Sequence, residues 1–130
     1  MTALAHAVTA AMLTPFDASG TPIPDAAGNY AASLVQHGVG ALAVLAHTGR
    51  GLHLSEDAKA AVIRTVRAAV EVPLIAGIGL SRQDTASPVA AERTLARAAE
   101  QMAASGADAL LIYPVTREAR SIAAGGCWPR

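Results

Sequence analysis

The short loop His47-Thr48-Gly49-Arg50 gathers the side chains of this sequence that are best suited to acid–base and anion-binding chemistry. The hydroxyl of Thr48 and the backbone N–H groups before the next helix could together hold an anion. The imidazole of His47 could pass protons near neutral pH, and the guanidinium of Arg50 could pair with a carboxylate. Each side chain also has a structural interpretation, as a turn cap or a solvated surface group, so both interpretations stay open.

Two further patterns suggest chemistry that the surrounding residues do not support. His47 and His53 are both possible metal ligands, but no convergent carboxylate accompanies them in the loop, so we expect no metal. Gly77-Ile78-Gly79 lacks the full glycine-rich phosphate-binding fingerprint and does not follow the first strand. These glycines are therefore predicted to allow close packing at the end of a strand.

The elements that would position the loop alternate between strand and helix along the chain. Strands are expected at 7–13, 41–46, 74–78 and 109–113, and helices over 25–37, from Ser55 to about Val70, and from Ser87-Pro88 to Gly106. This alternation predicts a parallel sheet. Functional residues of parallel α/β folds lie at the carboxyl ends of the strands, which is where the segment 46–51 falls.

The ends of the predicted helices are marked by residues with known preferences. Asp25 is expected to cap the first helix, Gly28 to weaken it, and Gly38 to end it in a left-handed conformation. Ser55 is expected to cap the second helix, and proline in the first turn favours a helix start near Pro88.

Length and composition define the architecture more closely. The chain has 130 residues, of which 52% are hydrophobic, 15% charged and only 3% aromatic. Such a composition predicts strands covered by helices and a core of Ala, Val, Leu and Ile. The expected fold is α/β, with about four parallel strands and three helices. A complete (β/α)₈ barrel takes about 250 residues, so this chain would be about half of such a barrel, and the family resemblance given below implies the N-terminal half. Residues 1–115 would form this unit and residues 116–130 an irregular tail.

Charge and targeting features exclude several classes of partner. Ten basic and ten acidic residues give no net charge and form no basic stripe, so nucleic acid is not expected as a partner. The single cysteine, Cys127, fits a reducing compartment. No signal-peptide pattern and no apolar segment of about 20 residues occurs. We therefore expect a cytoplasmic protein with no membrane contact and no cofactor.

Four ordered motifs resemble the dihydrodipicolinate synthase/N-acetylneuraminate lyase family over about residues 7–114. The motifs are Leu13-Thr14-Pro15-Phe16-Asp17 with Gly20, Ile23 and Asp25; Gly38-Val39-Gly40-Ala41-Leu42 followed by Thr48-Gly49 and Leu54-Ser55-Glu56; Val72-Pro73-Leu74-Ile75-Ala76-Gly77-Ile78-Gly79; and Ala103 to Asp108. The resemblance implies a class I lyase or aldolase that joins a lysine to a 2-keto acid, usually pyruvate, as a Schiff base.

The resemblance also assigns roles within the candidate loop. Thr48 matches the threonine that binds the keto-acid carboxylate, with His47 and Gly49 beside it as substrate-binding candidates. His47 replaces the family's proton-relay threonine, and Arg50 replaces its acidic residue. After the fourth strand the family's Pro-Tyr-Tyr is replaced by Pro114-Val115-Thr116. Tyr113 precedes that proline by one residue, and such a shift turns a strand side chain to the opposite face, so it is a doubtful substitute.

Schiff-base chemistry needs a lysine, and Lys59 is the only lysine among these 130 residues. It falls off the apolar stripe of the second predicted helix, so a solvated surface position is expected. The family's lysine, on the sixth strand, and a tyrosine on the fifth would lie beyond Arg130. We therefore expect this chain to be inactive by itself, either as a truncated product, which the loss of family pattern at Val115 favours, or as a short protein.

Two further functional interpretations remain. Four open strands predict self-association through the sheet edges or pairing with another half-barrel. A non-catalytic α/β module that binds an anion or assembles with a partner is thus an alternative to the lyase. A metal-dependent aldolase that uses His47 and His53 is a third interpretation.

Overall fold

The computed structural model describes residues 7–80 and 87–113. Along the chain, β1 (Thr9–Ala11) is followed by α1 (Pro24–Gln36), β2 (Ala41–Val44), the short 3₁₀ turn η2 (Gly51–His53), α2 (Glu56–Ala69), β3 (Leu74–Gly79), α3 (Pro88–Ala104) and β4 (Ala109–Tyr113). The predicted tail 116–130, its boundary after residue 115, and Pro114-Val115-Thr116 lie outside the described residues. No helix in the described part is long and apolar enough to cross a membrane.

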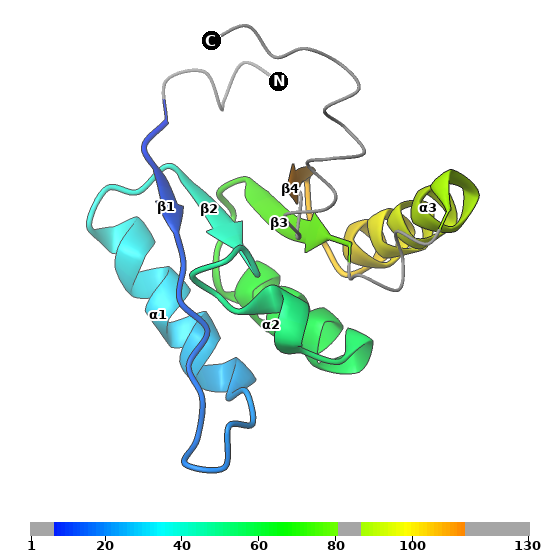
Figure 1. Ribbon diagram of the computed structural model, residues 1–130. Coiled ribbons are helices and arrows are strands. Elements are labelled where there is room, and N and C mark those ends of the chain that lie inside the picture. Colours follow the sequence, from blue (N-terminus) through cyan, green and yellow to red (C-terminus); the bar gives the residue numbers. More distant parts are fainter. Residues whose placement is uncertain (1–6, 81–86, 114–130) are drawn as a thin grey trace, which may run out of the picture.

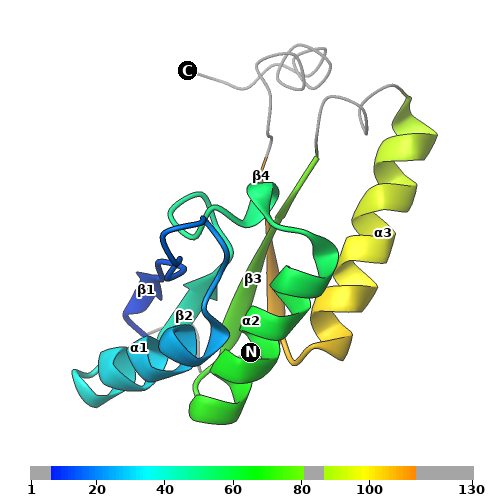
Figure 2. The ribbon, with the colours of Figure 1, turned by 90° about the horizontal axis from the view of Figure 1, so that it is seen from below.

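The four strands form one parallel sheet in the order β1-β2-β3-β4. One row across the sheet joins all four strands, with the register Ala11, Ala43, Ile75 and Ala109. The three α-helices lie together on one side of this sheet (Figures 1 and 2). The predicted parallel α/β fold with four strands and three helices is confirmed.

The core between sheet and helices is built almost entirely from aliphatic side chains. Its fully buried members include Leu42, Val44, Leu74 and Ala76 from the strands, Ala27 and Ala31 from α1, Val62, Ile63 and Val66 from α2, and Met102 from α3. This agrees with the low aromatic content. Burial of one of the Val, Leu, Ile or Met side chains stabilises the fold by about 1.5–3 kcal/mol.

The N-cap of α1 lies two residues before the predicted cap, Asp25. Ile23 is the N-cap and makes no side-chain cap, Pro24 opens the helix, and Asp25 lies in the first turn. Pro24 occupies the first helical position because the fixed φ of proline suits that position. At the other end the prediction holds: Gly38 follows the cap residue His37 with φ +92°.

Gly28 has a packing role that the sequence pattern did not indicate. It is buried where α1 faces α2, and a Cβ built on it would lie 3.0 Å from Thr65 Cγ2 and 3.3 Å from the Thr65 carbonyl oxygen. The absence of a side chain therefore lets the two helices approach closely.

The predicted strands β1 and β2 were too long at their ends. β2 stops at Val44 because Leu45 adopts a left-handed φ of +60°, which a strand cannot continue. β1 keeps hydrogen bonds just outside its bounds, from Gly40 N to the Val8 carbonyl and from Met12 N to the Ala43 carbonyl. The predicted starts of α2 and α3 are confirmed: Ser55 accepts from Ala58 N and Ser87 accepts from Ala90 N.

Asp108, just before β4, ties three elements together. Its Oδ2 atom accepts from Arg67 Nη1 of α2 at 3.0 Å and from the buried backbone N–H of Leu74 at 2.8 Å. Arg67 Nη2 donates in turn to the carbonyls of Val70 and Val72, which follow α2. One carboxylate thus aligns the start of β4 with β3 and with the end of α2.

We expect Asp108→Ala to lower the free energy of unfolding by about 1–3 kcal/mol, because it leaves the Leu74 N–H buried without an acceptor. Asp108→Asn keeps an acceptor and should cost less than half as much, since the Arg67 pair is partly exposed and contributes little. Urea unfolding of the three proteins measures both changes. Equal losses in the two variants would contradict the assignment to the Leu74 hydrogen bond.

Candidate functional site

The candidate site lies at the carboxyl ends of β1, β2 and β3, where parallel strands bring their following loops to one edge of the sheet. The segment after β1 begins at Met12, and the segment after β2 runs from Leu45 through η2. The second segment contains His47, Thr48 and Gly49, the three residues predicted to bind substrate.

The loop after β2 is folded tightly around the backbone of Leu45. A Cβ on Gly51 would lie 1.9 Å from the Leu45 carbonyl oxygen, and one on Gly49 would lie 3.1 Å from Leu45 N. From β3, a Cβ on Gly77 would lie 2.7 Å from Ala46 Cα. Three glycines therefore let the loop and the end of β3 pack backbone to backbone, which confirms the predicted packing role of Gly77.

Thr14, after β1, holds this loop by a buried hydrogen bond. Its hydroxyl donates to the Gly49 carbonyl oxygen at 2.7 Å, and the residue is 7% exposed. A second contact joins the same two segments, because the Arg50 guanidinium lies over the Phe16 ring, 5.5 Å from its centroid. The motif Thr14-Pro15-Phe16 in the sequence gives no indication of this role for Thr14, because Gly49 is 35 residues away.

The three predicted binding residues differ in solvent exposure. His47 and Thr48 are neighbours on the exposed surface of the loop, whereas Gly49 is buried beneath them. Gly49 therefore serves the loop through its carbonyl and its lack of a side chain. The Thr48 hydroxyl and the His47 imidazole are the exposed groups of this pair that can carry chemistry.

The backbone N–H groups expected to help bind an anion are largely engaged within the loop. Arg50 N donates to the His47 carbonyl and Gly51 N to the Ala46 carbonyl. In η2, His53 N donates to Arg50 and Leu54 N to Gly51. At the start of α2, Ala58 N is held by Ser55. The Thr48 side chain therefore carries more of any anion binding than the sequence suggested.

A structured turn follows Thr14-Pro15-Phe16. Asp17 Oδ1 accepts from the Ser19 hydroxyl at 2.6 Å and from the backbone N–H groups of Ser19 and Thr21. The Ser19 hydroxyl, followed by the Thr21 N–H, holds the pKa of Asp17 below its ordinary value because these donors favour the carboxylate. Asp17 organises the turn that leads into α1.

Among the described residues, no three His, Cys, Asp or Glu side chains gather in a way that could hold a metal ion, so the pair His47 and His53 has no third ligand there. Tyr113 stands opposite Gly79 in the register of β3 and β4.

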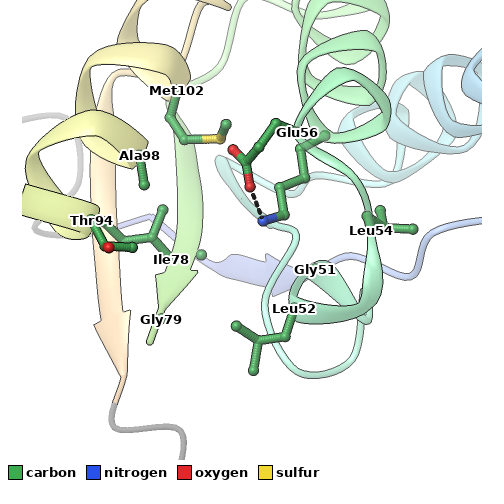
Figure 3. Close-up of a pocket in the computed structure, with 11 residues that line it drawn as sticks. Gly51, Leu52, Leu54, Glu56, Ile78, Gly79, Thr94, Ala98 and Met102 are labelled. Atoms are coloured by element: carbon green, nitrogen blue, oxygen red, sulfur yellow. Dashed lines mark hydrogen bonds and ion pairs between the residues drawn. The ribbon is translucent and has the colours of Figure 1, made fainter. Parts of the chain in front are cut away.

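Lys59 is not the solvated surface residue that the sequence pattern predicted. Its side chain is only 18% exposed, and its Nζ lies 2.7 Å from Glu56 Oε1, the ion pair drawn as a dashed line in Figure 3. It lines a cavity of about 210 Å³ between α2, α3 and the end of β3, with Ile78, Thr94 and Met102 among the other walls. This cavity is formed jointly by α2, α3 and the end of β3, an arrangement that the apolar stripe of one helix cannot reveal.

Comparison with known proteins places this arrangement in a family. The family model described as "Dihydrodipicolinate synthetase family" matches residues 4–116. The 4-hydroxy-tetrahydrodipicolinate synthase of Kineococcus radiotolerans is 41% identical over 101 residues, covering 76% of this chain and 31% of that protein. The enzyme of the same name from Synechococcus sp. strain CC9605 is 38% identical over 110 residues, covering 82% of this chain and 33% of that protein.

Solved structures agree with the fold. Dihydrodipicolinate synthase from Aquifex aeolicus superposes with a TM-score of 0.68 at 26% identity, covering 85% of this chain and 35% of that one. The dihydrodipicolinate synthase structure from Cyanidioschyzon merolae superposes with a TM-score of 0.68 at 28% identity, covering 85% of this chain and 36% of that one. The chain thus spans about a third of the length of its relatives and has the fold of the first part of their (β/α)₈ barrel. These matches show that the chain belongs to the dihydrodipicolinate synthetase family.

Proposed function

We propose that this chain supplies the carboxylate-binding side of a pyruvate-dependent lyase site, with Thr48 as the residue that holds the 2-keto acid. The observation that carries this proposal is the placement of Thr48, exposed at the carboxyl edge of the sheet on a loop that Thr14 clamps at Gly49. A hydroxyl on a fixed loop binds an anion with little loss of conformational freedom, because the loop is already ordered.

The neighbouring side chains have supporting roles. The Thr48 hydroxyl donates to the substrate carboxylate, and the His47 imidazole, next to it on the same exposed surface, is the candidate proton carrier. Arg50 lies over the Phe16 ring, so its charge adds a favourable field for an anion at this edge. Phe16 and Arg50 together also restrict the movement of the loop.

The covalent step of the family requires an amine that Lys59 does not provide. A Schiff base forms when a free amine attacks the keto carbon. Lys59 Nζ lies 2.7 Å from Glu56 Oε1 in an ion pair, in the layer between α2 and α3, and this ion pair competes with any attack on a keto carbon. We propose that these 130 residues bind the keto acid but do not carry out the lyase reaction alone.

Pyruvate should therefore bind the purified 130-residue chain, and Thr48→Val should weaken that binding roughly tenfold or more, the effect of losing a hydrogen bond to a charged group. Thr48→Ser keeps the hydroxyl and should bind like the parent. Titration monitored by NMR gives the three dissociation constants. Equal affinity for pyruvate in the Val and Ser variants would contradict the role of Thr48, and equal affinity for acetate and pyruvate would favour the simple anion-binding module.

Borohydride reduction in the presence of pyruvate should leave the mass of the intact chain unchanged, because Lys59 is the only lysine and is ion-paired. Mass spectrometry checks this result directly. A mass increase that disappears in Lys59→Met would overturn the proposed inactivity and make Lys59 the reacting amine. An increase that persists in Lys59→Met would place the adduct on the N-terminal amine.

Thr14→Val preserves the shape of the side chain but removes the donor to the Gly49 carbonyl, so the free energy of unfolding should fall by about 1–2 kcal/mol. Pyruvate affinity should fall as well, because the loop bearing Thr48 loses its clamp. Thr14→Ser retains the hydroxyl and serves as the control in thermal unfolding and in the titration. A Val variant that binds pyruvate like the Ser variant would rule out this positioning role.

A further inference from the structure

Arg50 is an exposed cation on the same tight turn as Thr48, at the carboxyl edge of the sheet. The turn is closed by a hydrogen bond from Arg50 N to the His47 carbonyl at 3.1 Å. Thr48 and Arg50 are two residues apart, so their Cα atoms lie at most about 7 Å from each other. One short turn thus carries a hydroxyl and a guanidinium that can reach two ends of one small molecule.

The backbone at Arg50 is one that residues with a side chain rarely adopt. Its φ is +53°, in the left-handed region that glycine enters without strain. Glycine occupies both neighbouring positions, Gly49 and Gly51, yet an arginine stands between them. Strained residues of this kind cluster at ligand-binding and catalytic sites, where the side chain has a function that offsets the strain.

The position of the Arg50 charge is fixed by the segment that follows β1. The guanidinium lies over the half-buried Phe16 ring, 5.5 Å from its centroid. Phe16 is itself held by an antiparallel bridge to Pro22. A guanidinium that already rests on a ring loses less conformational freedom when a ligand binds than a freely moving one does.

No carboxylate of the described residues neutralises Arg50. The ion pairs found there join Lys59 to Glu56 and Arg67 to Asp108. The sequence contains no acidic residue from 26 to 55, so the turn carries positive charge without a neighbouring acid along the chain. A planar guanidinium matches a carboxylate through two parallel N–H···O bonds, which makes this group suited to an anionic part of a ligand.

We propose that Arg50 binds a second carboxylate, so that the site takes 2-keto diacids in preference to 2-keto acids with an uncharged end. This assignment rests on the proposed function, in which Thr48 holds the carboxylate next to the keto group. The Arg50 guanidinium then donates to the carboxylate at the far end of the same molecule. Arg50 is thus a specificity-determining residue, and the proton transfers are left to other groups.

Two keto acids with the same carbon chain test this preference. 2-Oxoglutarate ends in a carboxylate, whereas 2-oxopentanoate ends in a methyl group. NMR titration of the 130-residue chain should give a dissociation constant for 2-oxoglutarate at least about threefold lower, the gain expected from one charge-assisted contact on an exposed surface. Equal dissociation constants for the two acids would overturn the proposal.

A matched pair of arginine variants locates the preference. Arg50→Gln keeps a side chain at the left-handed position and removes the charge, so the ratio of the two dissociation constants should fall close to one. Arg64→Gln removes the same charge from an exposed position on α2 and should keep the ratio of the parent chain. Circular dichroism checks the fold of each variant. Equal ratios in the two variants would assign the preference to net charge and overturn the role of Arg50.

Pyruvate, titrated in parallel, separates this inference from the proposed function. A chain that binds pyruvate through Thr48 but does not distinguish 2-oxoglutarate from 2-oxopentanoate would overturn the role of Arg50 and leave the role of Thr48 intact. A chain that binds none of the three acids would overturn both.

Discussion

The close backbone contact around Leu45 and Ala46 is the constraint on which the rest of the site depends. Leu45 turns out of β2 with a left-handed φ of +60°, and the space beside its backbone admits only glycine at Gly51 and Gly77. A side chain at Gly51 would overlap the Leu45 carbonyl. The chain can therefore reverse immediately after β2 and continue through Thr48 and η2 into α2. The end of β3 packs against the same segment, at Ala46.

This constraint explains why the segment after β1 matters to a loop 35 residues away in the sequence. The parallel register brings the ends of β1 and β2 together, and Thr14 then reaches the Gly49 carbonyl at 2.7 Å. The contact between Arg50 and Phe16 adds a second tie on the surface. Thr14 and Phe16, both far from Thr48 in the sequence, thus hold the loop on which Thr48 lies.

The same packing that builds the site also changes the environment of the lone lysine. Lys59 lines a cavity between two neighbouring helices and the end of β3, and it forms an ion pair with Glu56, one helical turn earlier. The prediction of a solvated lysine was wrong because exposure depends on the neighbouring helix α3. Gly28 is a second example. Considered within α1 alone it is a residue that weakens the helix, whereas its position beside Thr65 shows that it allows a close approach of two helices.

The sequence by itself determined the order and type of the elements, the serine cap of α2, the proline start of α3, the left-handed Gly38 and the packing role of Gly77. These features are local, because capping, turn chemistry and apolar periodicity act within a few residues. It also identified the loop around Thr48 through ordered motifs. Only the tertiary structure decided the clamp from Thr14, the engagement of the loop N–H groups and the burial of Lys59. Each of these depends on atoms brought together from distant segments, and no local pattern encodes such distances.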